Sequence, residues 1–332
     1  MSPVLAEFAG PGQALSLGSP ATPELDDGEV WLRVTCTTIC GSDRHTYHGR
    51  RSTPLPGYLG HEAIGIVEAS RRPDAQPGDR VTFSMLVSCG ECDRCAAGLG
   101  HKCRKVFKYG HENLPWTGTY GSHMRLLKGT ELAKLPGDLP DEAAAPINCA
   151  FATGIAVADH VVGHRVRVIG GGLVGLATAL AVLLAHPARE VEVIEPDTQR
   201  QVWAKRLGMK PSTDQPVDCL VECAGVRAAL EPAMAGLKIG GRLVLAGLVH
   251  PDSALPFTAE ALIRNLWTIV GVHNYAPGVL PRAVDLAAEF NRRIPCPEWT
   301  RTLPSLDELD TCLAGAPDEA LRVAVRFGPD PA

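Results

Sequence analysis

Four cysteines in one short segment constrain the fold of this chain more than any other feature. Cys89, Cys92, Cys95 and Cys103 follow the spacing C-x2-C-x2-C-x7-C. Thiolates this close in sequence can converge on one small ion, and zinc prefers sulfur ligands at about 2.3 Å with all four tetrahedral positions filled. The spacing therefore predicts a closed structural zinc site, with free or disulfide-bonded cysteines as the alternative.

Length and charge narrow the class of protein. A chain of 332 residues exceeds what one hydrophobic core usually serves, which predicts two domains. The net charge of -5 argues against a nucleic-acid partner. The first residues lack a signal-peptide pattern, and no window approaches the ~18 apolar residues that a membrane span needs. We therefore expect a cytoplasmic protein without a membrane partner, whose eleven cysteines are reduced thiols and metal ligands.

The pattern of apolar residues changes along the chain. Residues 1 to about 150 contain short apolar runs between Gly and Pro turn signals, which predict a β-rich domain. From about 153 to 275, apolar strands alternate with helical stretches, which is typical of βαβ units around a parallel sheet. The connection between 207 and 217 is short. Beyond 275, a helical segment near 279–291 precedes an apolar run at 321–327, which we expect to return to the first domain.

A glycine-rich turn joins a predicted strand to a predicted helix. The segment from Gly170 to Gly175 matches G-x-G-x-x-G, with Gly172 in the middle and Leu173 and Val174 opening the helix. In that context the glycines permit a tight turn, let backbone amides approach a pyrophosphate and allow close helix packing. The turn therefore predicts a dinucleotide site, with a mere packing device as the alternative.

An acidic residue after the next strand indicates which dinucleotide binds. Glu195 lies twenty positions beyond Gly175, where its carboxylate can accept hydrogen bonds from the adenosine ribose hydroxyls and repel a 2′-phosphate. This favours NAD over NADP. Arg200 lies close by in the sequence and weakens the preference.

A second set of metal-ligand residues is dispersed along the chain. Cys40 begins Cys-Gly-Ser-Asp, His61 lies in Gly-His-Glu, and Cys149 follows an asparagine. Each alone is usually a packed core group. Their order, together with the cysteine cluster and the glycine turn, carries the argument.

In that order the chain resembles the zinc-dependent alcohol dehydrogenases of the medium-chain dehydrogenase/reductase family, from about Glu29 onward. The resemblance implies an α/β fold with a GroES-like catalytic, zinc-binding domain (1–152 with 277–332) and a doubly wound Rossmann domain that binds NAD (153–276). It also implies a Cys2His catalytic zinc held by Cys40, His61 and Cys149. Asp43 would orient His61, and Glu62 would approach the metal transiently.

The resemblance further implies a mechanism and an assembly. Hydride passes between an alcohol, through a zinc-bound alkoxide, and NAD. Ser42 matches the hydroxyl of the family's proton relay, and His45 matches its terminal histidine, with a plain surface residue as the alternative for His45. Two zinc ions per chain, a small-molecule substrate and a homodimer or homotetramer are expected.

The motifs fit more than one class of substrate. The motifs resemble a polyol, threonine and phosphonate-associated branch, so a secondary alcohol or polyol is expected, with or without an anionic group. Arg50 and Arg51 can recognise an anion or be ordinary surface residues, and for His101, His111, His123 and Trp116 we expect packing roles. The alternatives are an NADPH-dependent aldehyde or ketone reductase and a non-catalytic nucleotide-binding protein of the same fold.

Overall fold

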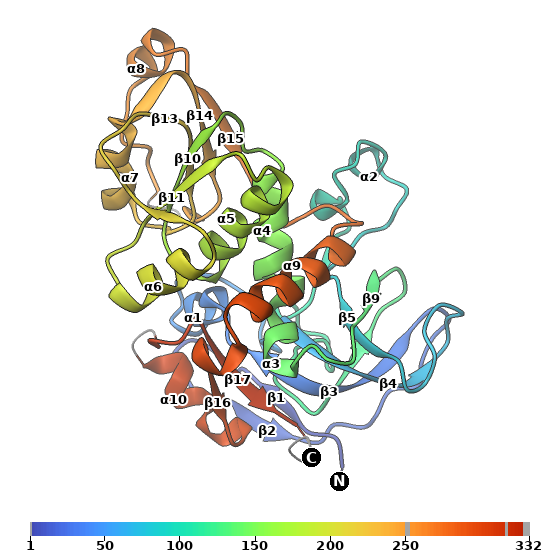
Figure 1. Cartoon of the computed structure of the whole chain (residues 1–332). Coiled ribbons are helices and arrows are strands. Elements are labelled where there is room, and N and C mark those ends of the chain that lie inside the picture. Colours follow the sequence, from blue (N-terminus) through green and yellow to red (C-terminus); the bar gives the residue numbers. More distant parts are fainter. Residues whose placement is uncertain (1, 250–252, 316–317, 328–332) are drawn as a thin grey trace. The chain divides into compact units, whose positions relative to one another are not determined.

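The computed structural model describes residues 2–249, 253–315 and 318–327 (Figure 1). They form two compact units. Unit 1 contains the chain up to Cys149, Ala276–Val284 and the chain from Cys296 onward, and unit 2 contains Ala150–Tyr275 and Asp285–Pro295. The division of the chain into domains at 152/153 and 276/277 stays a proposal, since Asp285–Pro295 is counted with unit 2. Within the described ranges, no helix combines the length and apolar character needed to cross a membrane.

A seven-stranded sheet organises unit 1. Its path is β16-β17-β3-β4-β5-β9, and β8 also pairs with β3. The strands are β16 (Thr300–Leu303), β17 (Arg322–Arg326), β3 (Val30–Thr38), β4 (Glu62–Ser70), β5 (Arg80–Phe83), β9 (Leu132–Lys134) and β8 (His123–Leu126). Figure 1 shows β17 (red) beside β3 (blue), and the two strands run antiparallel with Ala324 opposite Thr38. The C-terminal run thus returns to the first domain, as expected.

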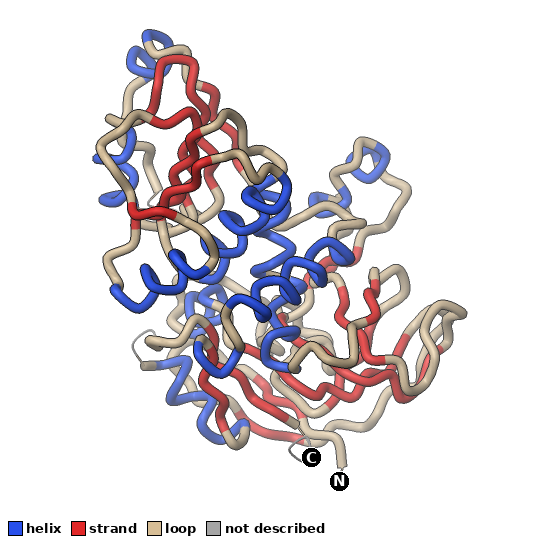
Figure 2. Tube along the Cα trace, viewed as in Figure 1, coloured by secondary structure: helices blue, strands red, loops and turns tan. Residues whose placement is uncertain are grey.

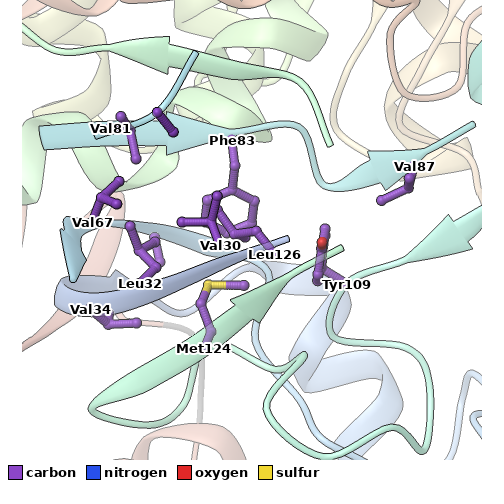
Figure 3. Packing of buried hydrophobic residues seen from close by; sticks show 12 residues of the cluster. Val30, Leu32, Val34, Val67, Val81, Phe83, Val87, Tyr109, Met124 and Leu126 are labelled. Atoms are coloured by element: carbon purple, nitrogen blue, oxygen red, sulfur yellow. The ribbon is translucent and has the colours of Figure 1, made fainter. Parts of the chain in front are cut away.

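Apolar side chains from these strands form the core of unit 1. Val30, Leu32 and Val34 alternate along β3 and are all fully buried, as expected for one face of a pleated strand. They pack against residues of β4, β5 and β8 (Figure 3). Tyr109 joins this core from a loop, and its ring meets that of Phe83 edge to face at 5.4 Å between centroids. The loop after the cysteine cluster is thereby tied to the sheet.

Short elements surround this sheet. The remaining elements of unit 1 are β1 (Leu5–Glu7), β2 (Ser16–Gly18), α1 (Gly41–Tyr47), β6 (Leu86–Val87), α2 (Asp93–Ala96), η1 (Gly100–Lys102), β7 (Phe107–Lys108), α3 (Asp141–Ala144), η2 (Ala145–Asn148), η3 (Cys296–Glu298), η4 (Leu306–Glu308) and α10 (Leu309–Ala314). Helix α9 (Leu280–Arg293) begins in unit 1 and continues into unit 2.

Unit 2 is built on a parallel sheet of six strands with the order β12-β11-β10-β13-β14-β15. This is the strand order 3-2-1-4-5-6 of the Rossmann fold, as predicted. The strands are β10 (Arg165–Ile169), β11 (Glu190–Ile194), β12 (Lys210–Pro211), β13 (Val217–Glu222), β14 (Leu237–Leu245) and β15 (Thr268–Gly271). The other helices are α4 (Ala150–Ala158), α5 (Leu173–Ala185), α6 (Thr198–Arg206), α7 (Arg227–Met234) and α8 (Ala259–Arg264). Figure 2 shows these strands (red) with helices (blue) alongside.

The connection after β12 is short, as the sequence indicates. Only five residues separate β12 from β13, and none of them is helical. Each other pair of consecutive strands in this sheet has at least one helix between its members. Strand β12 pairs with β11 through only two residue positions, so this edge of the sheet is minimal.

Candidate metal centres and cofactor turn

The four clustered cysteines converge in space. Their sulfurs lie within 4.8 Å of one another, with Cys92 Sγ 3.5 Å from Cys95 Sγ and Cys103 Sγ 3.4 Å from Cys89 Sγ. A disulfide needs about 2.05 Å, whereas sulfurs bound at about 2.3 Å to one tetrahedral ion lie roughly 3.8 Å apart. The donor set and spacing therefore fit a zinc ion held by four thiolates.

Backbone amides stabilise negative charge on this cluster. The N–H groups of Cys89 and Lys105 each donate to Cys103 Sγ at 3.3 Å. Hydrogen bonds from the backbone of Arg104 and then Cys95 lower the pKa of the Cys92 thiol to about 6. Metal binding requires deprotonated sulfur, so these amides favour the binding form.

The dispersed residues also meet. Cys40 directly precedes α1, His61 and Glu62 lie where β4 begins, and Cys149 follows η2; one ligand atom of each lies within 4.8 Å of the others. Cys40 Sγ and Cys149 Sγ are 3.9 Å apart, the spacing of two ligands of one ion rather than of a disulfide. Two sulfurs and one imidazole fit a zinc site with one position left for a further ligand.

Asp43 holds the imidazole in place. Asp43 Oδ1 lies 3.1 Å from His61 Nδ1, while its Oδ2 accepts the Cys40 N–H and the Tyr120 hydroxyl, each at 3.0 Å. Asp43 is fully buried, so all of its charge is balanced by these contacts. With Nδ1 directed at Asp43, Nε2 of His61 is the atom available to a metal.

The carboxylate of Glu62 is fully engaged by protein groups. Arg322 Nε and Nη2 donate to it at 2.7 and 2.9 Å, and Thr38 Oγ1 donates at 2.6 Å. Arg322 comes from β17, far away in the sequence. Glu62 is therefore a neutralised carboxylate beside the candidate centre.

The surroundings of His61 are negative. Burial disfavours the charged ring, but the Asp43 carboxylate and the Cys40 sulfur raise the pKa of His61 to about 10. Hydrogen bonding with Cys149 and His61 lowers the pKa of the Cys40 thiol well below its usual range. Negative charge that stabilises a protonated His61 is also suited to a divalent cation.

The candidate relay residues lie on one short helix. Ser42 Oγ is 3.5 Å from His61 Nε2, the ring atom available to a metal. His45 lies three residues further along α1 and is exposed, whereas Ser42 is partly buried. Residues three apart share a helix face, so the two side chains lie on one face that leads from the centre towards solvent.

The glycine turn of unit 2 is tight and closely packed. Gly170 has a φ of +101°, which favours glycine, and a Cβ on Gly175 would collide with the Gly170 carbonyl oxygen. A Cβ added to Gly172 would meet no atom within 4 Å, so a ligand can approach the Gly172 backbone. Leu173 and Val174 form the first turn of α5.

Glu195 and Arg200 lie beyond the end of β11. Glu195 Oε2 accepts the Gly171 N–H at 2.6 Å, and its Oε1 accepts the Asp197 N–H at 2.9 Å. Glu195 is therefore hydrogen-bonded to the glycine turn. Arg200 lies in α6, and its Nε is buried without a hydrogen-bond partner among the described residues.

Comparison with known proteins agrees with this architecture. Residues 26–137 match the alcohol dehydrogenase GroES-like domain family, and residues 174–289 match the zinc-binding dehydrogenase family. The chain belongs to the zinc-dependent alcohol dehydrogenases of the medium-chain dehydrogenase/reductase family. An L-threonine 3-dehydrogenase from Anaeromyxobacter sp. (strain Fw109-5) is 28% identical over 307 residues, which cover 83% of this chain and 88% of that protein.

Solved structures show the same fold. An alcohol dehydrogenase from Thermotoga maritima superposes with a TM-score of 0.87 at 23% identity, covering 98% of this chain and 99% of its own. A zinc-binding dehydrogenase from Sinorhizobium meliloti 1021, bound to NADP, gives 0.86 at 24% identity with the same coverage of both chains. Membership of this dehydrogenase family makes the chain an enzyme that uses zinc and a nicotinamide cofactor.

Arg322 and Lys108, which lie near the candidate catalytic centre of this dehydrogenase, were not singled out in the sequence, and His111 was expected only to pack. Arg322 binds Glu62, and the rings of His111 and His61 lie 5.4 Å apart between centroids. Lys108 precedes His111 by three residues. His111 therefore lies beside the centre, not only in a packed loop as expected. A signal existed only for Lys108 and His111, since both follow the cysteine cluster closely.

Proposed function

We propose that this dehydrogenase transfers a hydride between a secondary alcohol or polyol, with or without an anionic group, and NAD. The observation that carries the proposal is the convergence of Cys40, His61 and Cys149 within 4.8 Å. Membership of the family supports alcohol oxidoreduction in general. The name of the Anaeromyxobacter relative supports a secondary alcohol, because threonine is one.

The residues around this centre have distinct proposed roles. Cys40, His61 and Cys149 hold the catalytic zinc, and Asp43 fixes the orientation of His61. When bound, zinc would supply a Lewis acid that lowers the pKa of the substrate hydroxyl, and a nicotinamide cofactor would supply the hydride acceptor. Ser42 accepts the hydroxyl proton, and His45 passes it to solvent. A second zinc, held by the four clustered cysteines, is structural.

Glu195 supports NAD as the cofactor. Its carboxylate is fastened to the glycine turn, where the adenosine ribose of a bound dinucleotide would meet it. A 2′-phosphate would be repelled there, and Gly170, Gly172 and Gly175 would bring the backbone close to the pyrophosphate.

Two observations favour an NADPH-dependent reductase instead. The unpartnered Nε of Arg200 is available to a phosphate, and the Sinorhizobium neighbour binds NADP.

A cytoplasmic location and a homodimer or homotetramer complete the proposal. The location is supported by the eleven cysteines, which all lie in the described ranges and form no disulfide there.

Metal and cofactor measurements test the proposal together. The purified protein is expected to contain two zinc ions per chain, to bind NAD more tightly than NADP, and to reduce NAD with a panel of secondary alcohols and polyols. Cys149→Ala should remove one zinc and all turnover. One zinc per chain in the unaltered protein, with no turnover, would support a non-catalytic nucleotide-binding protein.

A further inference from the structure

The turn that follows β7 is pressed against the candidate catalytic centre. Gly110 has a φ of +74°, and a Cβ there would collide with the carbonyl oxygen of Gly60 and approach His61 Cβ to 3.2 Å. Only glycine allows this approach. The preceding residue, Tyr109, is buried in the core, and its hydroxyl accepts the Leu127 N–H at 2.6 Å. Lys108 and His111 flank this anchored pair, so the fold fixes both beside His61.

Lys108 is a partly buried cation without a counter-ion. Its ammonium makes no hydrogen bond or ion pair with any residue in the described ranges. The acids nearest the centre are already engaged, because Asp43 binds His61 and Tyr120 while Glu62 binds Arg322. Burying a charge without a partner is costly, so this arrangement requires a reason.

A second cation and an unpartnered nitrogen lie close to Lys108. Burial and the Arg51 charge lower the pKa of Lys108 to about 8, so the ammonium is still charged at pH 7. The Arg51 guanidinium also lacks a counter-ion among the described residues. Thr53 Oγ1 donates to the His111 carbonyl at 3.2 Å, which ties the Arg51 segment to the turn.

His111 completes the group. Its Nε2 is buried and has no hydrogen-bond partner within the part of the chain that the structure describes. A histidine ring always carries a proton on at least one nitrogen, so this imidazole can donate a hydrogen bond. An imidazole donor next to two cations suits an anion.

We propose that Lys108, Arg51 and His111 form a subsite that binds an anionic substituent of the substrate. The inference rests on the proposed function and narrows it, because it makes the substrate a hydroxy acid or hydroxyphosphonate rather than a neutral polyol. Arg51 offers paired N–H donors and Lys108 a point charge, which together match a carboxylate or a phosphonate. The anionic group would sit beside the carbon that loses its hydride.

The test compares matched substrates and a matched variant. The zinc-loaded enzyme is assayed with NAD and short secondary alcohols that carry a carboxylate, a phosphonate or a neutral methyl ester. Lys108→Met removes the charge and keeps the chain length. Lys128→Met is the control, because Lys128 is exposed and, among the described residues, pairs only with Asp27. Binding of acetate and of methylphosphonate is measured separately by calorimetry, without turnover.

The expected result is a preference for the charged alcohols that Lys108→Met lowers about 10- to 100-fold in kcat/KM, as expected for a lost hydrogen bond to a charged group. The methyl ester should change less than about threefold, and Lys128→Met should resemble the unaltered enzyme. The probe that binds with the higher affinity in calorimetry identifies carboxylate or phosphonate as the ligand.

Two other outcomes separate the inference from the proposed function. Turnover of neutral alcohols, with equal kcat/KM in the unaltered enzyme and Lys108→Met for every substrate, overturns the subsite and leaves the function intact. If no alcohol is oxidised, the function fails, and calorimetry still decides the subsite. The subsite is supported if acetate or methylphosphonate binds the unaltered enzyme but not Lys108→Met. It is rejected if neither probe binds the unaltered enzyme.

Discussion

The guanidinium of Arg322 donates two hydrogen bonds to the carboxylate of Glu62, across 260 residues of sequence. Glu62 is fully buried and follows His61, one of the proposed catalytic ligands. A buried ion pair with this geometry adds little net stability, but loss of one member leaves the other uncompensated. An intact centre therefore depends on strand β17, which carries Arg322.

Replacement of Arg322 by Met is expected to lower the free energy of unfolding by about 3–5 kcal/mol, because the charge of Glu62 is then buried alone. Urea denaturation of the purified variant measures the loss. Combining it with Glu62→Gln should recover much of the stability, since neither charge remains. Simple additivity of the two single substitutions would contradict a direct ion pair.

Substitution of Cys92 by Ser is expected to remove one zinc ion per chain and to lower thermal stability. The three remaining sulfurs leave the ion with an incomplete tetrahedral shell, and metal binding contributes directly to folding. Atomic emission spectrometry and calorimetry measure the two effects. Cys312→Ala is the control, because Cys312 lies in neither cluster; equal zinc loss in both variants would refute a site built on Cys92.

Loss of the Ser42 hydroxyl is expected to slow the chemical step. Ser42→Ala should lower kcat about 10²- to 10⁴-fold, the usual contribution of a positioned proton-transfer group, while zinc content stays unchanged. Single-turnover kinetics measures the step, and Ser42→Thr, which keeps a hydroxyl, should restore part of it. Near-normal turnover in Ser42→Ala would exclude the relay.

Glu195 is expected to set the cofactor preference. Glu195→Gln removes a charge-assisted hydrogen bond to the ribose and the repulsion of a 2′-phosphate, so the ratio of NADP to NAD affinity should rise about 10- to 100-fold. Fluorescence titration of both reduced cofactors measures the ratio. Glu260→Gln alters an exposed acid in the same unit and serves as control. An unchanged ratio in the Glu195 variant would remove the argument for NAD.

Asp218 is expected to make unit 2 sensitive to acid. Burial opposes its ionisation, but Lys238 and the N–H groups of Arg165 and His164 lower the pKa of Asp218 to about 2. A depressed folded pKa stabilises the protein above the unfolded value, and the benefit is lost as pH falls from about 4 towards 2. Asp218→Asn should therefore cost about 1–2 kcal/mol at pH 7 and progressively less below pH 4. A cost that stays constant with pH, in urea denaturation between pH 7 and pH 3, would contradict this.

Sequence reasoning succeeds where the chemistry is local. The strand at Arg165–Ile169, the turn at Gly170 and the helix from Leu173 follow one another directly, so each supports the interpretation of the next. The cysteine cluster is equally compact. The short apolar run at 30–34 predicts a strand, and the structure places it within β3.

The same reasoning fails where partners are distant in the sequence. Arg322 is one arginine in an apolar run, and nothing nearby reveals that it neutralises Glu62. The importance of Lys108 and His111 depends on the approach of Gly110 to Gly60, which is a tertiary contact. The pairing of β17 with β3 reveals the role of Arg322, and the absence of counter-ions around Lys108 among the described residues reveals that of Lys108.

The pairing of β17 with β3 also has a consequence for biosynthesis. A ribosome makes Cys40, His61 and Cys149 long before it makes Arg322, since translation proceeds from the N-terminus. A nascent chain therefore contains all three proposed metal ligands, together with β4 and β8 as partners of β3, while β17 is still missing. The Glu62 carboxylate beside these ligands thus gains its Arg322 partner only after translation has reached β17.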